Sequence, residues 1–200
     1  MDPALQRRLI ESVASAMVEH VEELSELDRA IGDGDHGLNM QRGFSAVLGQ
    51  IDELAAKSPP DALKAIGTTL LMKVGGASGP LYGTLFMTLG KEWPAAVDAA
   101  ALARALAAAI AALQRLGKSE VGQKTLLDVL APVQQELAAG GAGLPARLRE
   151  RAAMAAAATT PLRALRGRAS FLGERSIGHM DPGARSSMLM IDAICRTLEG

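Results

Sequence analysis

The stretch Asp2–Val21, DPALQRRLIESVASAMVEHV, predicts the fold class of this chain. Its first two residues, Asp2 and Pro3, resemble a helix N-cap followed by proline at the first helical position. The apolar residues that follow recur at every fourth position and share one face of a helix: Leu5, Leu9, Val13, Met17 and Val21. The chain is therefore expected to begin with an amphipathic helix.

The same periodicity continues along most of the chain, and no segment alternates apolar and polar residues as a strand would. We therefore predict an all-α protein of about eight antiparallel helices, with residues 1–200 as one domain. The glycines at 140–143 are interpreted as a tight helix connection, with a domain boundary as the alternative. Pro132 is expected to kink its helix or to delay its start. One further helix is predicted to start at Ser58-Pro59, with Leu63, Ile66 and Leu70 on one stripe. The last helix is predicted at Gly183–Leu198, with Met188, Ile191, Cys195 and Leu198 facing inward. The other helices are predicted at Met40–Ala56, Leu81–Lys91, Val97–Leu116, Leu126–Ala138 and Leu144–Ala158.

Composition excludes several classes of protein. A net charge of −1 gives no general attraction to nucleic acid or to an anionic membrane, and 2% aromatic residues leave few side chains for bases to stack on. The most apolar stretch, Ala99–Leu113, contains Arg104 and is interpreted as too short to span a bilayer. A single cysteine, Cys195, allows no internal disulfide, and the N-terminus lacks the apolar run of a signal peptide. We expect a soluble cytoplasmic protein.

Three carboxylates gather in the first of three glycine-rich loops, Asp28–Asn39. Two unit charges about 4 Å apart repel by roughly 4 kcal/mol at an effective dielectric of about 20. Asp28, Asp33 and Asp35 should therefore either splay into water or share a hard cation such as Mg²⁺. The loop matches G-x-G-x-x-G, but no strand precedes it and its aspartates would repel a pyrophosphate; it also lacks the glycine and glutamate of an EF-hand. Metal binding is the favoured interpretation, and a solvated turn that caps helices is the alternative.

His36 and Asn39 follow directly, and one of these side chains could contact a phosphate while the other fixes the loop. The second loop, Gly75–Gly83, offers backbone N–H groups, the Ser78 hydroxyl and a helix start at Pro80, all of which favour anions. Close helix packing through its glycines is the alternative. Together the two loops favour a phosphoryl-transfer site, which relies on positioning and charge neutralisation.

The third loop, Arg166–Gly183, is long and without clear periodicity. Arg168 and Arg175 could neutralise phosphate charge there. Asp181, before Pro182, is interpreted as a plain cap of the last helix. The lysines of a further loop, Lys118 and Lys124, are interpreted as a solvated face.

Taken in this order, the motifs closely resemble the nucleotide-binding L subunit family of dihydroxyacetone kinases, the DhaL family. The resemblance covers nearly the whole chain and rests on these segments: Leu27–Met40, Gly75–Gly83, Lys124-Thr125 and Arg168–Gly183. The family often has methionine where this chain has Leu126, and tyrosine where it has Phe171; both changes preserve apolar volume.

The resemblance implies a barrel of eight antiparallel helices, a single DhaL-type domain, that holds ADP or ATP at one end. It implies that Mg²⁺, taken as two ions, is held by Asp28, Asp33 and Asp35, and that Arg168 assists these aspartates in catalysis. It further implies that the nucleotide contacts a set of loop residues, with Gly117 and Leu126 bordering the adenine: His36, Gly37, Leu38, Asn39, Gly76, Ala77, Ser78, Gly117, Thr125, Leu126, Arg168, Asp181, Pro182 and Gly183.

In this family a separate K subunit holds dihydroxyacetone, and a phosphotransferase-system M subunit recharges ADP to ATP. The resemblance therefore implies a kinase subunit that is active only with partners; a homodimer stays open, as does an ATP-exchanging nucleotide. The alternatives are a related kinase with a tetrose or fatty acid substrate, and a non-enzymatic helical module that senses nucleotide.

Overall fold

The computed structural model describes residues 2–200, and within them every regular element is helical. This confirms the all-α prediction; ten α-helices and one 3₁₀ helix replace the expected eight. The elements are α1 (Pro3–Glu19), α2 (Val21–Ile31), α3 (His36–Leu48), α4 (Ile51–Ala56), α5 (Pro59–Lys73), α6 (Ser78–Lys91), α7 (Ala99–Gly117), α8 (Leu127–Ala139), α9 (Leu144–Ala158), η1 (Arg168–Ser176) and α10 (Pro182–Glu199).

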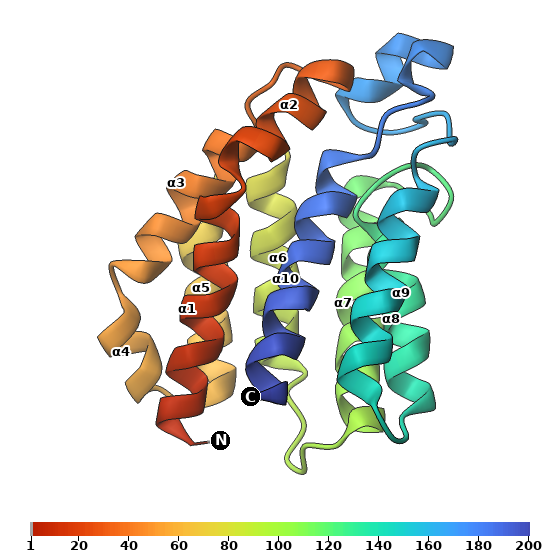
Figure 1. Ribbon diagram of the computed structural model, residues 1–200. Coiled ribbons are helices and arrows are strands. Elements are labelled where there is room, and N and C mark those ends of the chain that lie inside the picture. The colour runs from red at the N-terminus through yellow and green to blue at the C-terminus, as the bar shows by residue number, and fades with distance from the viewer. Residues whose placement is uncertain (1) are drawn as a thin grey trace.

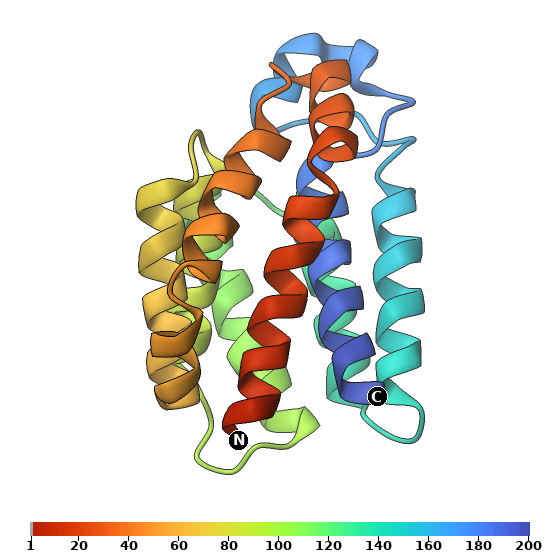
Figure 2. The ribbon, with the colours of Figure 1, turned by 60° about the vertical axis from the view of Figure 1, so that its left-hand side comes forward.

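Eight of these helices pack side by side in a closed ring. The contacts run from α1 to α3, then through α5, α6, α7, α8, α9 and α10 in order, and α10 packs against α1 again. Figures 1 and 2 show these helices running up and down, with both chain ends at the lower end. The two remaining α-helices are additions: α2 contacts α3, α10 and η1 at the upper end, and α4 contacts α1 and α5.

Local signals predicted several helix boundaries correctly. Asp2 accepts hydrogen bonds from the backbone N–H groups of the first turn of α1, and Ser58 accepts one from Asp61 at the start of α5. The predicted range Leu144–Ala158 is the observed range of α9. The range Met40–Ala56 is wrong, because α3 begins at His36 and a turn at Gly49-Gln50 separates it from α4. The expected first helix is likewise divided at His20.

Pro132 lies inside α8 and does not delay its start. Because α8 begins at Leu127, Pro132 is in its second turn, where the missing N–H removes one backbone hydrogen bond. The helix continues to Ala139 and ends at Gly140, whose φ is 61°. Gly140–Gly143 is a tight connection between α8 and α9, which pack against each other.

The core fills the interior of the ring with aliphatic side chains. Met17, Leu70 and Leu127 have no accessible surface, and Phe44 meets Phe86 edge-on at 6.4 Å between ring centroids. On α1 the buried apolar stripe is Ile10, Val13, Ala14 and Met17. It differs from the predicted series at every fourth residue, because Leu5 and Leu9 are only partly buried at its edge. On α10, Cys195 is buried, but the prediction for Leu198 is wrong, since this side chain is 53% exposed.

The alanine-rich helix α7 has 19 residues and is, among residues 2–200, the one helix long and apolar enough to cross a membrane. The expectation that this stretch is too short is therefore wrong by length. However, α7 packs between α6 and α8, and small side chains such as Ala103 and Ala109 are buried there. A core helix of a soluble protein meets the same criteria, so length and composition alone are weak evidence for a membrane span.

Candidate functional site

The three aspartates of the first loop converge at the upper end of the ring. Asp28 lies in the last turns of α2, while Asp33 and Asp35 lie in the turn before α3. Gly34 has φ +78°, a conformation that glycine adopts without strain, and it turns the chain back toward Asp28. Asp28 Oδ2 then accepts hydrogen bonds from the backbone N–H groups of Asp35, at 2.9 Å, and His36, at 3.2 Å. One oxygen from each of the three carboxylates lies within 4.8 Å of the others.

This arrangement is electrostatically unfavourable without a counter-charge. Burial raises the pKa of Asp28, and the neighbouring Asp33 and Asp35 carboxylates raise it further. The two backbone hydrogen bonds lower this pKa but do not cancel the increase. The donor set consists of carboxylate oxygens only, which are the ligands that Mg²⁺ prefers. The three carboxylates converge rather than splay apart, so their geometry is compatible with a shared hard cation.

Arg168 supplies a positive charge beside this cluster. It begins η1, the short 3₁₀ helix over the upper end of the ring, and forms an ion pair with Asp33. The side chain of Arg168 is 65% exposed, so this pair by itself stabilises the fold little. Arg175, on the same segment, is also exposed.

His36 joins the aspartate loop to the Gly75–Gly83 loop. The imidazole is 6% exposed, with Nδ1 3.0 Å from Ser78 Oγ and Nε2 3.0 Å from Ser186 Oγ. Burial lowers the pKa of His36 to about 4, although Asp35 opposes the shift. At neutral pH the ring is therefore an uncharged hydrogen-bonding bridge between α3, α6 and α10.

The second loop shows the close helix packing that was one of its two interpretations, while phosphate binding stays a prediction. Gly76 has φ +62°, and Ala77 then leads into α6, whose first residue is Ser78. Gly75 lies against the buried Asn39 amide: a Cβ there would be 2.5 Å from Asn39 Oδ1. Farther along, a Cβ on Gly83 would be 2.9 Å from Leu71 Cβ, which indicates close packing of α5 on α6. The loop start forms an exposed helix N-terminus beside His36, and the later glycines serve packing.

The other residues expected at the nucleotide lie around the same end of the ring. Gly117 ends α7 and lies near Leu81 of α6, since a Cβ on Gly117 would be 3.8 Å from Leu81 Cδ2. Leu126 is buried and lies against Gly183, whose Cβ would be 3.6 Å from Leu126 N. Thr125 Oγ1 accepts a hydrogen bond from Leu127 N at the start of α8.

Not every expected residue makes a contact that ties it to the aspartates. Leu38 is 54% exposed in the first turn of α3, and Gly37 beside it packs against the backbone of α2 at Val21 and Ser25. Phe171 is 89% exposed on η1.

Asp181 caps α10, as the simpler interpretation predicted. Its Oδ2 accepts a hydrogen bond from Ala184 N at 2.7 Å, and Pro182 and Gly183 form the first turn. Burial raises the pKa of Asp181 to about 7, with the Asp128 carboxylate adding to the shift. The cap places the Asp181–Gly183 turn directly against Leu126.

The prediction that Lys124 belongs to a solvated face is wrong. Lys118 is exposed, but Lys124 is only 1% exposed and has φ +62°. Burial lowers the pKa of Lys124. Four backbone carbonyl oxygens lie within hydrogen-bond distance of its Nζ, whose three hydrogens they share: Thr159 at 2.9 Å, Leu162 at 3.1 Å, Thr160 at 3.4 Å and His179. A lysine flanked by polar residues gives no local sign of burial, because all four acceptors are distant in sequence. Lys124 holds the α7–α8 loop against the segment that leads to Asp181.

Two further side chains of the site had no role in the sequence interpretation. Tyr82 is 1% exposed, and its hydroxyl lies 2.6 Å from Ser186 Oγ. Ser186 in turn contacts His36. Burial raises the pKa of Tyr82 to about 12. The sequence signal for Tyr82 was a single tyrosine in a segment of otherwise small residues. No local feature of the sequence distinguished Ser186.

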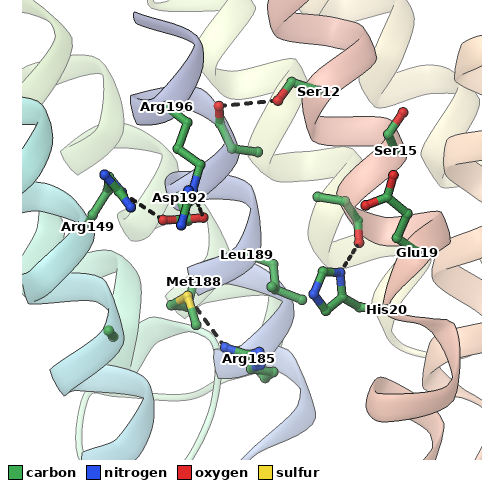
Figure 3. A pocket seen from close by; sticks show the side chains of 13 residues that line it. Ser12, Ser15, Glu19, His20, Arg149, Arg185, Met188, Leu189, Asp192 and Arg196 are labelled. Carbon is green, nitrogen blue, oxygen red and sulfur yellow. Dashed lines mark hydrogen bonds and ion pairs between the residues drawn. The ribbon is translucent and has the colours of Figure 1, made fainter. Parts of the chain in front are cut away.

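A cavity lies elsewhere on the molecule. It has about 590 Å³ and lies between α1, α9 and α10. Figure 3 shows its polar walls, where Arg149 and Arg196 both reach Asp192, at 2.8 and 2.7 Å. Arg185 is paired in the same way with Glu23. Because these arginines are already neutralised and no residue of the aspartate loop lines the cavity, it is not part of the candidate site.

Comparison with known proteins identifies the family. The DAK2 domain model matches residues 30–196. The chain is 42% identical over 191 residues to the ADP-binding subunit DhaL of PEP-dependent dihydroxyacetone kinase 1 from Listeria innocua, covering 95% of this chain and 94% of that subunit. It is also 42% identical over 181 residues to the corresponding subunit from Escherichia coli, covering 86% of each chain.

Longer proteins share the domain. The triokinase/FMN cyclase of Rattus norvegicus is 33% identical over 198 residues, which cover 96% of this chain and 34% of that protein. The dihydroxyacetone kinase of C. freundii, solved in complex with AMP-PNP and Mg²⁺, superposes with a TM-score of 0.79 at 22% identity, again over 96% of this chain and 34% of that one. This structural likeness shows the fold, and the sequence matches confirm the resemblance drawn from the motifs: the chain belongs to the DAK2 domain family.

Proposed function

We propose that this chain is the ADP/ATP-binding subunit of a dihydroxyacetone kinase and that it delivers the γ-phosphate of a magnesium nucleotide to dihydroxyacetone held by a separate K subunit. The observation that carries the proposal is the cluster of Asp28, Asp33 and Asp35, whose carboxylate oxygens lie within 4.8 Å of one another. The 42% identity to a subunit named as ADP-binding, over 95% of the chain, supports the same function.

The aspartates are proposed to hold Mg²⁺, taken as two ions, through Asp28, Asp33 and Asp35. When bound, the metal would neutralise the charge that develops on the phosphates during transfer. The chain's own residues position the nucleotide: His36, Gly37, Leu38 and Asn39 along it, and Gly76, Ala77 and Ser78 at its phosphates. Ser78 begins α6, where unpaired backbone N–H groups favour an anion.

Arg168 is proposed to move from Asp33 to the phosphates once the metal occupies the carboxylates. A guanidinium offers paired donors to phosphate oxygens, and such charge neutralisation is a large part of catalysis in phosphoryl transfer. The purine would lie beside Gly117, Thr125 and Leu126, and the Asp181–Gly183 turn would complete the pocket. The contact between Leu126 and Gly183 supports this placement, because it joins the two segments into one continuous wall.

The sugar and the phosphoryl donor are proposed to come from partners. The close relatives carry the word subunit in their names, while the chain spans about a third of the rat triokinase and of the solved kinase. We therefore propose a K subunit for dihydroxyacetone and a phosphotransferase-system M subunit that recharges the nucleotide. The whole chain is proposed to form one nucleotide-binding domain that works in the cytoplasm.

A related kinase is the second candidate. The 33% identity to a triokinase over 96% of the chain favours a nucleotide domain that serves another carbonyl substrate. The two candidates differ in the partner and in the acceptor rather than in the nucleotide site.

Reconstitution separates them. The purified chain is mixed with the K and M subunits encoded in the same genome, phosphoenolpyruvate and the general phosphocarrier proteins, and the phosphorylated product is measured by mass spectrometry. Formation of dihydroxyacetone phosphate that requires this chain supports the proposal. Transfer only to another carbonyl compound would favour the second candidate, and absence of any transfer with bound nucleotide would favour a non-enzymatic module.

A further inference from the structure

A buried chain of hydroxyl groups continues from His36 into the interior. Ser186 Oγ lies 3.0 Å from His36 Nε2 and 2.6 Å from the Tyr82 hydroxyl, and Ser78 Oγ lies 3.0 Å from His36 Nδ1. Ser186 has no accessible surface, and Tyr82 is 1% exposed. The four groups come from α3, α6 and α10, whose adjoining ends lie at the upper end of the ring in Figure 1.

The hydrogen count at Ser186 restricts the direction of these bonds. A serine hydroxyl has one hydrogen to donate and two lone pairs to accept with. Ser186 Oγ lies 3.0 Å from the Pro182 carbonyl oxygen and 3.2 Å from that of Gly183, and a carbonyl oxygen can only accept. If the Ser186 hydrogen goes to one of these carbonyls, both lone pairs remain for donors from Tyr82 and His36.

The arrangement that forms the most hydrogen bonds therefore places the His36 proton on Nε2. Tyr82 O–H and His36 Nε2–H both donate to Ser186, Ser186 donates to a carbonyl, and Nδ1 accepts from the Ser78 hydroxyl. The opposite arrangement, with the proton on Nδ1, leaves the Ser78 hydrogen without a partner among residues 2–200. Because only the Nε2–H arrangement gives every hydrogen of these four groups an acceptor within the described part of the protein, this tautomer is expected to dominate.

We propose that Tyr82 and Ser186 are positioning residues that hold His36 as the Nε2–H tautomer and thereby turn the Ser78 hydroxyl toward the imidazole. Ser78 then offers a phosphate its backbone N–H rather than its hydroxyl. The effect on nucleotide binding rests on the proposed function, whereas the tautomer is a property of the free chain.

Nitrogen NMR of the free protein tests the tautomer directly. The background variant His20→Gln/His179→Gln leaves His36 as the sole histidine, and neither replaced ring contacts the hydroxyl chain. We expect long-range ¹H–¹⁵N correlations to show a protonated Nε2 and an unprotonated Nδ1. A dominant Nδ1–H signal would overturn the proposal.

Substitutions at neighbouring serines supply the matched comparison. Ser186→Ala removes the acceptor for Nε2–H and should give a mixture of both tautomers, with Mg²⁺–ADP affinity about tenfold weaker. Ser187→Ala is the control, because Ser187 is equally buried and lies 3.3 Å from the Tyr82 hydroxyl but is not hydrogen-bonded to His36. It should leave the tautomer unchanged.

A second variant keeps the test decisive if Ser186→Ala does not fold. Ser78→Ala leaves Ser186 in place, so the Nε2–H tautomer should persist. A switch to Nδ1–H in Ser78→Ala, or an unchanged single tautomer in folded Ser186→Ala, would overturn the proposal. A wild-type chain with the expected tautomer that binds no Mg²⁺–ADP would instead contradict the proposed function and support the positioning role.

Discussion

The two ends of the helical ring are built differently. At the lower end, side chains cap the starts of α1, α5 and α7; Asp98, for example, accepts a hydrogen bond from Ala101 N at 2.7 Å. The glycine connection Gly140–Gly143 before α9 is the exception there. At the upper end, glycine turns and η1 enclose most of the buried polar side chains, among them His36, Lys124 and Ser186. Since polar groups are costly to bury, their concentration at one end indicates a functional site rather than a simple connection between helices.

The carboxylates of the two ends have opposite electrostatic environments. At the lower end, hydrogen bonds from Ser58 and Lys64 lower the pKa of Asp61, so its charge is stabilised by its neighbours. At the upper end, burial and two adjacent carboxylates raise the pKa of Asp28. The Asp61 carboxylate at the lower end is stabilised by protein groups alone, whereas a divalent cation would stabilise the carboxylates at the upper end.

The core that joins both ends should show the largest loss of stability. We expect Phe44→Ala to lower the free energy of unfolding by about 3–5 kcal/mol, because the ring is 1% exposed and its removal leaves a cavity. Urea unfolding followed by circular dichroism measures this. As a control, Leu198→Ala at an exposed position should change stability by less than about 0.5 kcal/mol. Equal effects of the two variants would contradict the assignment of the core.

Two lysines of one loop allow a buried position at the upper end to be compared with an exposed one. Lys124→Met should destabilise the protein by roughly 1–3 kcal/mol, because it leaves buried carbonyl oxygens without a donor. Lys118→Met, at an exposed position of the same loop, should change the unfolding free energy by less than about 0.5 kcal/mol. Thermal unfolding of both variants provides the comparison, and similar melting temperatures would contradict the buried role of Lys124.

The smallest expected effect is a pH dependence at Asp181. Its pKa is about 7 in the folded chain against 3.8 for an ordinary aspartate, so between these values the folded state binds more protons than the unfolded state. The contribution to stability is therefore present below about pH 4 and lost as the pH rises through 7. We expect the wild type to lose stability relative to Asp181→Asn over this range, by about 1 kcal/mol, since Asp181 keeps part of its surface exposed.

Chemical denaturation of both proteins at about pH 4, 5.5, 7 and 8 measures this difference. The asparagine introduced by Asp181→Asn can still cap α10, so the cap itself is retained. A difference that stays constant, or that moves in favour of the wild type as the pH rises, would contradict the raised pKa.

Sequence patterns predicted what depends on neighbouring residues. The caps at Asp2 and Ser58, the range Leu144–Ala158 and the gathering of small residues around Ser78 are local features, and periodicity or spacing reveals them. The turn at Gly49 was missed, because the apolar stripe continues across it and hides the helix end that this glycine signals.

Features that depend on tertiary contacts could not be read in this way. Lys124 is buried because carbonyls 35 to 55 positions away converge on it, and Ser186 meets His36 across 150 positions. No window of sequence contains both partners. The resemblance to a family indicated that these segments belong together, but not which atoms meet.

The aspartate cluster is proposed to hold Mg²⁺ against a nucleotide, and isothermal titration calorimetry of ADP with and without Mg²⁺ tests this most directly. We expect ADP binding by the wild type to depend on Mg²⁺. In Asp35→Asn the ADP affinity should fall by more than about 100-fold, which is more than the loss of a residue that only supports a metal ligand would cause. Circular dichroism should show unchanged helicity and no loss of stability in Asp35→Asn, because the substitution relieves repulsion in the cluster. Equal ADP affinity in the two proteins, or binding that does not depend on Mg²⁺, would contradict a metal-bridged nucleotide at these carboxylates.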